Sequence, residues 1–504
     1  MDSYERLMIR AKDIEVLDSA RGIVDWDLET YMPPAAIGLR SEQLSLLSRL
    51  LHEMWSSPEV GDLLTQLEMR RESLDKVQKR NIYLMRRKHD IAIRIPSDLV
   101  GKLSKQKAIA TDVWKRAKAT SDWKLFEPEL RKLIDMAVER EEIAMEVKGI
   151  STVYDSMLDD YERGITAEET ARVFRQLRDR LVPLAEICAE ASQAVETDFL
   201  SREVPIDVQK RVATDIGELI GYDTTSDKAR GRIDETVHPF TTGYFDDVRV
   251  TVHYYENNVP AMIYAMLHEG GHAIYEQNFS RNFMYQPVGN AASFGMHESM
   301  SRFIENIIGR TPEFWEYYLP RLNEITGGAF GGIGLMDFVR ATNLVRRSKI
   351  RIEADEVTYS LHIIIRFEIE RELFSGRTSV SELPQVWNEK YDQYLGVEIE
   401  NDGEGVLQDT HWGSGLYGYF PSYALGNIYD GLWVEKMKSE MPEWRGSLVA
   451  GKLGPIIGWL ADNIQRWGAL YDPKELAKKV CGKEIDAGPF LDYLGEKYRQ
   501  MFDV

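Results

Sequence analysis

Cysteine is scarce in this chain, since its 504 residues include only Cys188 and Cys481, which lie far apart and form no CxxC arrangement. This scarcity excludes a disulfide framework and a cysteine-rich metal site. Any metal must therefore be bound by histidine, aspartate or glutamate. Few cysteines also suit a reducing compartment, so we expect a cytoplasmic protein.

Long apolar runs and an excess of basic charge are missing as well. No stretch of about 18 apolar residues occurs, so the sequence predicts no membrane span. The opening residues include several acids and no continuous apolar run, and they do not resemble a secretory signal. With 62 Lys and Arg against 82 Asp and Glu, the net charge of −20 disfavours nucleic acid as a partner. Binding to phosphate backbones depends on clustered basic residues.

Helix-forming sequence dominates what is present. Residues 62–91 and 128–147 are rich in Glu, Arg, Lys, Leu and Met, with apolar residues every three or four positions, as amphipathic helices require. Residues 248–255, VRVTVHYY, alternate partly in the manner of a strand. No Ser- or Pro-rich linker divides the chain. We therefore predict one mainly helical domain, residues 1–504, in which helical segments at residues 1–235 and 431–504 flank a metal-site core at residues 236–430.

The stretch AMLHEGGHAIY, from Ala265 to Tyr275, carries two histidines four residues apart. Capping asparagines at 257 and 258 and a proline at 260 predict a helix that runs to about residue 279. Residues four apart share a helical face, so His268 and His272 present both imidazoles to one point. HExxH on a helix is a recognised zinc-binding arrangement. Glu269 points about 100° around the axis, where it can reach a water at the metal without being a ligand.

Two glycines, Gly270 and Gly271, interrupt this helix pattern. Each costs about 1 kcal/mol of helix stability relative to alanine, so their presence needs a compensating reason. We expect that the missing side chains allow another backbone, a substrate or a neighbouring helix to approach closely beside the metal.

A third metal ligand is expected from the next helical stretch, residues 293–309. It offers Glu298, and a carboxylate from a second helix can complete a His₂Glu zinc site. The alternative is that Glu298 only forms an ion pair with Arg302, four residues later. Glu276 and Glu305 are weaker competitors for the metal.

Six short motifs follow one another along the chain: HPF at 238–240, DVRVT at 247–251, HEGGH at 268–272, HES at 297–299, IRIEAD at 350–355 and GVLQDTHW at 405–412. With these motifs, and with WDLETYMPP near the N-terminus, the sequence resembles the HEXXH metallocarboxypeptidase family typified by thermostable carboxypeptidase Taq. The resemblance covers essentially the whole chain.

The resemblance implies a mainly helical fold with a deep substrate groove and a small antiparallel β-sheet beside the active site. It implies a homodimeric carboxypeptidase of broad specificity that acts on peptides. It also implies one divalent metal ion per subunit, zinc first and cobalt second. By motif, His268, His272 and Glu298 are the expected metal ligands, and Glu269 is the expected general base.

An exopeptidase must also bind the free carboxylate of its substrate, for which the planar guanidinium of arginine is well suited. The resemblance indicates Arg351 in IRIEAD for this role, and an ordinary ion pair with Glu353 or Asp355 is the alternative. Arg249 in DVRVT is a second candidate, although the neighbouring Asp247 favours a structural pair.

A second group of candidates surrounds the expected metal site. Tyr423 and His411 are proposed donors to the oxyanion that forms during peptide hydrolysis, with simple packing as the alternative. His238 and His297 are expected to orient ligands or to contact substrate, and the alternative for both is a buried structural histidine.

Two other functions remain open at the level of sequence. An endo-oligopeptidase could use the same metal site, because HExxH and a distant glutamate do not distinguish internal cleavage from trimming of an end. A non-catalytic peptide-binding protein could keep the fold. Glu269 argues against this second alternative, because a structural metal site has no use for a general base.

Overall fold

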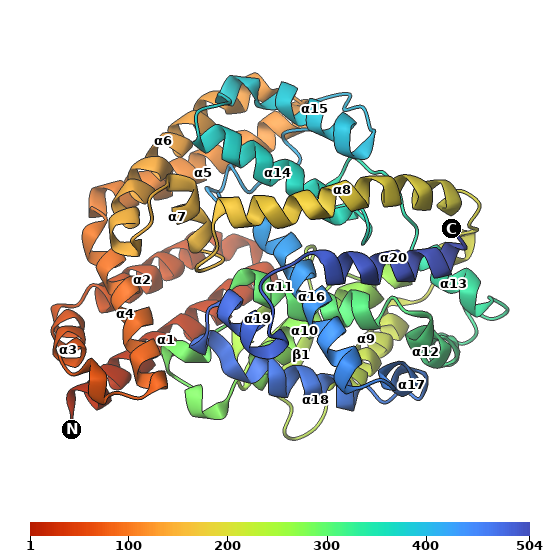
Figure 1. Cartoon of the computed structure of the whole chain (residues 1–504), viewed down its shortest axis with the longest axis horizontal. Coiled ribbons are helices and arrows are strands. Elements are labelled where there is room, and N and C mark those ends of the chain that lie inside the picture. Colours follow the sequence, from red (N-terminus) through yellow and green to blue (C-terminus); the bar gives the residue numbers. More distant parts are fainter.

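The computed structural model describes all 504 residues and is chiefly helical, which confirms the predicted fold class (Figure 1). The N-terminal half contains α1 (Ser3–Glu29), α2 (Ile37–Trp55), α3 (Pro58–Glu68), α4 (Lys76–Arg94), α5 (Ser97–Thr120), α6 (Trp123–Lys148), α7 (Val153–Asp159), α8 (Ala167–Ser192) and α9 (Ile206–Ile220). Helices α1 to α4 lie at the end of the molecule that carries the N-terminus, and the C-terminus lies at the opposite end.

After a small sheet the chain returns to helices. These are α10 (Val259–Asn278), α11 (Phe294–Arg302), a π-helical turn at Phe303–Ile308, α12 (Pro312–Ile325), α13 (Leu335–Thr342), α14 (Tyr359–Phe374), α15 (Leu383–Leu395), α16 (Pro421–Glu440), α17 (Trp444–Val449), α18 (Gly454–Asn463), α19 (Pro473–Cys481) and α20 (Gly488–Phe502). None of the helices combines the length and the apolar composition that a bilayer crossing requires.

The small sheet consists of β1 (Gly231–Glu235), β2 (Thr241–Tyr244) and β3 (Asp247–Val252), in the order β1-β3-β2. The expectation of purely antiparallel strands is wrong, because β1 pairs with β3 in parallel and only β2 pairs with it antiparallel. A two-residue turn joins β2 to β3 and makes them a hairpin. The chain reverses once more between β1 and β2, so β1 and β3 run in the same direction. The three valines of β3 share one face of the sheet and are fully buried, so this face packs against the core.

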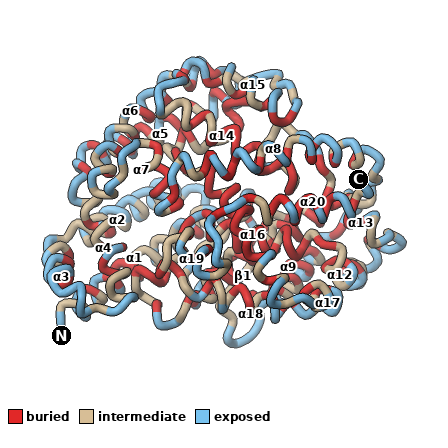
Figure 2. The backbone as a smooth tube through the Cα atoms, in the orientation of Figure 1, coloured by how far each residue is buried: buried red, intermediate tan, exposed pale blue.

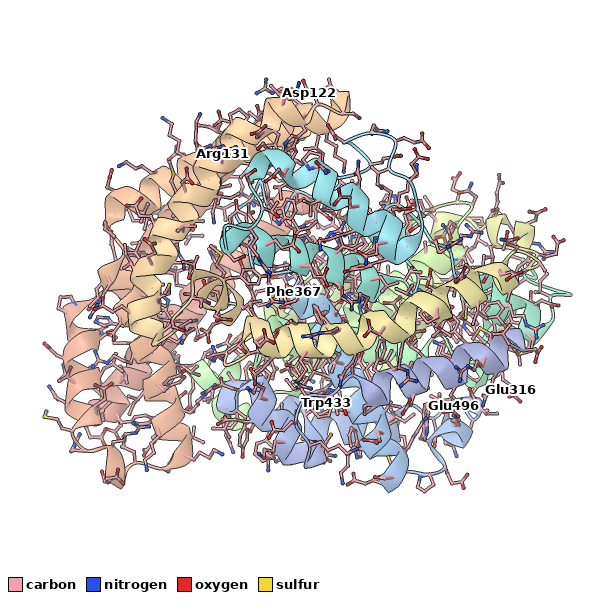
Figure 3. The ribbon with its side chains drawn as sticks, turned by 45° about the horizontal axis from the view of Figure 1, so that its top comes forward. Asp122, Arg131, Glu316, Phe367, Trp433 and Glu496 are labelled. Carbon is pink, nitrogen blue, oxygen red and sulfur yellow. The ribbon has the colours of Figure 1, made fainter.

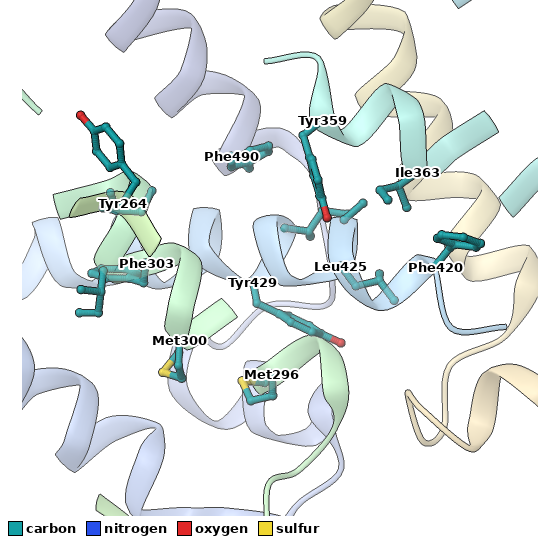
Figure 4. Close-up of a cluster of buried hydrophobic side chains, with 14 of the residues drawn as sticks. Tyr264, Met296, Met300, Phe303, Tyr359, Ile363, Phe420, Leu425, Tyr429 and Phe490 are labelled. Carbon is teal, nitrogen blue, oxygen red and sulfur yellow. The ribbon is translucent and has the colours of Figure 1, made fainter. Parts of the chain in front are cut away.

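One continuous cluster of 105 buried hydrophobic residues extends from Ile95 to Met501 (Figure 2). Phe367 on α14 and Trp433 on α16 belong to it, whereas Glu316 and Glu496 are exposed on the outside (Figure 3). Figure 4 shows part of this cluster, including Met296 and Met300 of α11 and Leu425 and Tyr429 of α16. A separate cluster of eight residues lies among α1, α3 and α4. The division of the chain at residues 235 and 430 stays a prediction.

Candidate metal centre

Helix α10 begins where the sequence predicted. The Asn258 side chain accepts a hydrogen bond from the Ala261 backbone N–H at 3.2 Å, and Pro260 occupies the first turn. The helix is buried along most of its length, and it packs against α9, α11 and the sheet. It therefore carries the side chains of His268, Glu269 and His272 into the interior of the molecule.

The two glycines of α10 have different surroundings. A Cβ atom on Gly271 would lie 2.6 Å from the Cα of Ser301 and 2.7 Å from the carbonyl oxygen of Met300, both in the backbone of α11. A Cβ on Gly270 would meet only the end of the Ile220 side chain, at 2.4 Å. The close approach of a neighbouring helix thus explains why position 271 is a glycine despite its cost to helix stability. That approach places α11, and with it Glu298, directly beside the two histidines.

The three expected metal ligands converge. The Nε2 atoms of His268 and of His272 are each 3.8 Å from Oε2 of Glu298, and one ligand atom from each residue lies within 4.8 Å of the others. Zinc–nitrogen bonds of about 2.0 to 2.1 Å in a tetrahedron place ligand atoms about 3.3 Å apart, so the observed spacing fits an ion with only small adjustments. Glu298 also accepts a hydrogen bond from Arg302 at 2.7 Å, but through Oε1, so this ion pair leaves Oε2 facing the two imidazoles.

The Nδ1 atom of His268 is 3.0 Å from Oε2 of Glu305, whose Oε1 accepts a hydrogen bond from Arg310 at 2.8 Å. Glu305 lies in the π-helical turn that follows α11, a feature that is often found at functional sites. Such a partner at the far nitrogen fixes the orientation of a metal-binding imidazole. Glu305 is thus engaged at the far nitrogen of His268, where a partner of a metal-binding imidazole is expected.

His272 has a comparable support on its far side. Its Nδ1 atom is 2.6 Å from Nδ1 of His297, and Nε2 of His297 is 2.9 Å from Oε1 of Glu276. Glu276, the other competitor considered from sequence, is thus also engaged behind an expected ligand. Both Nε2 atoms remain directed toward Glu298, as a shared metal ion requires.

The electrostatics of the cluster suit a cation. Burial opposes protonation of His268, yet Glu298, Glu305 and Glu269 together raise its pKa to about 9. For His272, burial and the nearby His297 and His268 lower the pKa well below its ordinary value, which keeps this imidazole neutral. Neutral imidazoles are the form that binds metals, and the surrounding carboxylates supply negative charge that a divalent ion would balance.

Glu269 is only 7% exposed and forms a hydrogen bond beside the metal ligands. Its Oε2 accepts a hydrogen bond from the Thr241 hydroxyl of strand β2 at 2.7 Å. Burial raises the pKa of the Glu269 carboxyl above its ordinary value. Thr241 was not identified from the sequence, since a threonine in a short strand carries no signal of such a role.

A cavity of about 590 Å³ opens beside these side chains. Its walls come from the segment after α7, strand β2, helices α10 and α11, and the start of α16. Six of the ten candidate residues line it: His268, Glu269, His272, His297, Glu298 and Tyr423. The structure thus brings together the HExxH helix, the HES segment and the distant tyrosine.

His411 and Arg351 lie behind Tyr423. The Nε2 atom of His411 is 3.5 Å from the Tyr423 hydroxyl, and the Arg351 guanidinium is 5.3 Å from the centre of the Tyr423 ring. Arg351 is buried and pairs with Asp409 at 2.8 Å. The expected alternative partners, Glu353 and Asp355, do not form this ion pair, because they follow Arg351 in a tight turn while Asp409 faces it from a distant loop.

Arg249 and His238 lie outside this cavity. Arg249 donates two hydrogen bonds to Asp247, both at 2.8 Å, and its guanidinium lies 4.3 Å from the centre of the Trp26 ring. His238 is exposed in the loop between β1 and β2, although the next two residues, Pro239 and Phe240, line the cavity. The expectation of a structural pair for Arg249 thus matches its position.

Arg163 is the one arginine that lines the cavity, and no motif in the sequence singled it out. Its Nε donates to Asp472 at 2.7 Å, and its Nη2 donates to the Ala292 carbonyl at 3.1 Å. Its place in the wall depends on tertiary packing, which brings the segment after α7 beside α11.

A helical fold in which an HExxH helix, a carboxylate from a second helix and a buried glutamate face one large cavity defines a metallopeptidase. The chain belongs to the carboxypeptidase Taq (M32) metallopeptidase family, which it matches over residues 6–498. It is 35% identical to thermostable carboxypeptidase 1 of Thermus thermophilus over 99% of both chains. It is 36% identical to carboxypeptidase 1 of Bacillus subtilis over 97% of both chains.

Solved structures agree with this assignment. The M32 carboxypeptidase from Deinococcus radiodurans R1 superimposes with a TM-score of 0.95 at 33% identity and full coverage of both chains. The family resemblance predicted from the motifs is therefore confirmed, and the protein is a metallocarboxypeptidase that depends on a divalent metal ion. The non-catalytic alternative is set aside, and the carboxypeptidase is favoured over the endo-oligopeptidase.

Proposed function

We propose that this enzyme releases C-terminal amino acids from peptides of varied sequence, with one zinc ion held by His268, His272 and Glu298. The observation that carries the proposal is the convergence of two Nε2 atoms on one carboxylate oxygen, with both Nδ1 atoms already engaged. Two imidazoles and a carboxylate suit zinc, and cobalt is the second choice for the same ligands.

Glu269 is the proposed general base. When bound, the metal ion would polarise the scissile carbonyl and lower the pKa of a water at the site. The Thr241 hydroxyl holds Oε2 of Glu269, and Oε1 forms no hydrogen bond within the protein. Glu269 can therefore accept a proton from the attacking water and pass it to the leaving amine. The raised pKa of this buried carboxyl favours such proton uptake.

Tyr423 and His411 are the proposed donors to the oxyanion. Tyr423 lines the cavity, and His411 stands within 3.5 Å of its hydroxyl, so the two can act as a linked pair. Burial lowers the pKa of His411 to about 4, which keeps its ring neutral. His297 is proposed to orient His272 through their shared Nδ1 contact.

Arg351 remains the proposed anchor for the substrate carboxylate. Arg351 lies behind the Tyr423 ring, 5.3 Å from its centre, so it would reach the substrate carboxylate past this ring. Arg163 is a second candidate because it lines the cavity itself. A homodimer and a cytoplasmic location, both expected from the sequence, complete the proposal.

The Glu269→Gln variant tests the proposed base. We expect it to bind one metal ion per chain as the wild type does, because Glu269 is not a ligand. We expect kcat to fall by about a thousandfold, in the range that general acid–base catalysis usually contributes. Metal content and release of C-terminal residues are measured on the same preparation. Glu256→Gln, an exposed carboxylate near the start of α10, is the matched control. A metal-replete Glu269→Gln enzyme with full turnover would refute the role.

A further inference from the structure

A second cavity of about 550 Å³ lies next to the metal-site cavity. Its walls come from the middle of α1, from strand β2 and from the loop before α11. Asn290 lines both cavities, and β2 contributes Thr241 to the first and Thr242, Gly243 and Tyr244 to the second. The two cavities are thus adjoining regions of one groove, and β2 runs along it.

Strand β2 offers free backbone groups along this groove. It is an edge strand, since its only partner is β3. The Thr251 N–H donates to the Phe240 carbonyl at 2.9 Å, so the alternation of an antiparallel ladder directs the backbone groups of Thr241 and Gly243 away from β3. An extended peptide can pair with such an edge. A peptide paired with β2 would advance about 3.3 Å per residue, from beside Glu269 into the second cavity.

The second cavity carries unbalanced negative charge. Its lining has five carboxylates and two guanidinium groups: Glu15, Asp18, Asp25, Asp246, Asp247, Arg21 and Arg249. Three of the acids are paired, Asp18 with Arg21 at 2.7 Å, Asp247 with Arg249 at 2.8 Å, and Asp246 with Arg281 at 2.6 Å. Glu15 and Asp25 form no ion pair.

Of these two unpaired acids, Glu15 is the more unusual, because its side chain is buried and the residue is only 8% exposed. Its one hydrogen bond comes from the Asn290 amide to Oε1 at 3.3 Å, and Oε2 has no partner. Burial raises the pKa of this carboxyl, Glu276 and Asp18 add to the effect, and Lys88 opposes it. A buried carboxylate is normally paired, so its unused oxygen in a cavity wall indicates a place for a cation.

We propose that the second cavity binds the stretch of a peptide on the N-terminal side of the scissile bond and favours a lysine or arginine side chain there. This inference rests on the proposed carboxypeptidase function. Because such an enzyme cuts before the last residue, every other residue of the substrate lies on the N-terminal side of the cut. Three residues of β2, Thr242 to Tyr244, line the second cavity, and this length exceeds what the single residue on the C-terminal side of the cut requires. The unpaired acids Glu15 and Asp25 supply the preference for a basic side chain.

Paired peptides test the proposal on the zinc-loaded enzyme. The two members of a pair differ only in lysine or glutamine at one upstream position, which is moved along the peptide from pair to pair. At one position we expect kcat/KM to favour lysine by about fivefold or more, the effect of one partly buried ion pair. Glu15→Gln and Asp25→Asn should each reduce this ratio, and the double variant should bring it close to one.

Asp13→Asn is the matched control, because Asp13 is an exposed carboxylate of the same helix that does not line the cavity. It should keep the wild-type ratio. Equal rates for lysine and glutamine peptides at every position in the wild type would overturn the proposal, as would an unchanged ratio in the double variant. Should Glu15→Gln fail to fold, the exposed Asp25 still allows the test through Asp25→Asn alone.

A binding measurement separates this inference from the proposed function. The zinc-loaded Glu269→Gln variant is titrated with the same peptide pairs, and the two dissociation constants are compared. Tighter binding of the lysine peptide supports the proposed preference of the second cavity even if the wild type releases no C-terminal residue. Equal dissociation constants overturn it even if the wild type is an active carboxypeptidase.

Discussion

At the scale of single residues, the site depends on what lies behind each ligand. The convergence of His268 and His272 was predictable, because a spacing of four on a helix directs both side chains to one side. Spacing favoured Glu298 over Glu305, although the two lie seven positions apart and were expected on the same side of one helical stretch. The structure distinguishes them by the histidine atoms that each Oε2 faces. Oε2 of Glu298 faces Nε2 of both histidines, whereas Oε2 of Glu305 contacts Nδ1 of His268.

Removing the support behind His268 should weaken metal binding. Glu305→Gln loses the negative charge that holds the Nδ1 hydrogen, so we expect the dissociation constant for zinc to rise by about tenfold or more. The dissociation constant is measured by competition with a chromophoric chelator. Glu316→Gln, an exposed carboxylate on α12, should leave the constant at the wild-type value. An unchanged constant in Glu305→Gln would contradict the supporting role.

At the scale of elements, the sequence patterns predicted where helices occur better than they predicted the turns that divide them. Residues 62–91 were expected as one amphipathic helix, but they form portions of α3 and α4, which a turn separates. The reason is a capping box in which Asp75 and Gln78 exchange hydrogen bonds at the start of α4. The apolar faces of both helices then meet α1 in one small core. The apolar residues keep their helical spacing through the turn between α3 and α4, so the sequence pattern does not reveal this turn.

The contact between α10 and α11 gives a prediction about one methyl group. Gly271→Ala forces a Cβ into the backbone of α11, so we expect a loss of about 1 to 3 kcal/mol in the free energy of unfolding, despite the better helix propensity of alanine. Gly270→Ala is the matched control, because its Cβ meets only the end of the Ile220 side chain. Urea unfolding of the metal-free proteins compares them. Equal stability of the two variants would show that the close approach is not needed.

At the scale of the whole molecule, segments far apart in sequence meet at buried polar groups that no pattern reveals. Composition and apolar periodicity sufficed for a mainly helical domain, and alternation in VRVTVHYY located β3. The parallel partner of β3 and the place of Arg351 beside Asp409 depend on tertiary packing, and local sequence does not encode them. Glu370 of α14 is a further example, since it accepts hydrogen bonds from Trp412, Gly418 and Tyr154.

Glu370 should make stability depend on pH. Burial raises the pKa of its carboxyl to about 7, above the value of about 4.3 in an unfolded chain. The folded protein therefore binds this proton more strongly, and the stabilisation is lost as pH rises through 7. Between about pH 5 and pH 8 the wild type should lose about 2 to 3 kcal/mol relative to Glu370→Gln. Urea unfolding at both pH values measures this difference.

The exposed variant Glu398→Gln is the control for this pH dependence and should follow the wild type. A difference between wild type and Glu370→Gln that is the same at both pH values would show that Glu370 is not protonated in the folded protein.

The most direct test of the metal centre is anomalous diffraction at the zinc edge from crystals grown with zinc. We predict one strong peak per chain, about 2 Å from Nε2 of His268, Nε2 of His272 and a carboxylate oxygen of Glu298. A peak that lies beside Glu305 or Glu276 instead, or that leaves Glu298 out of bonding range, would contradict the account.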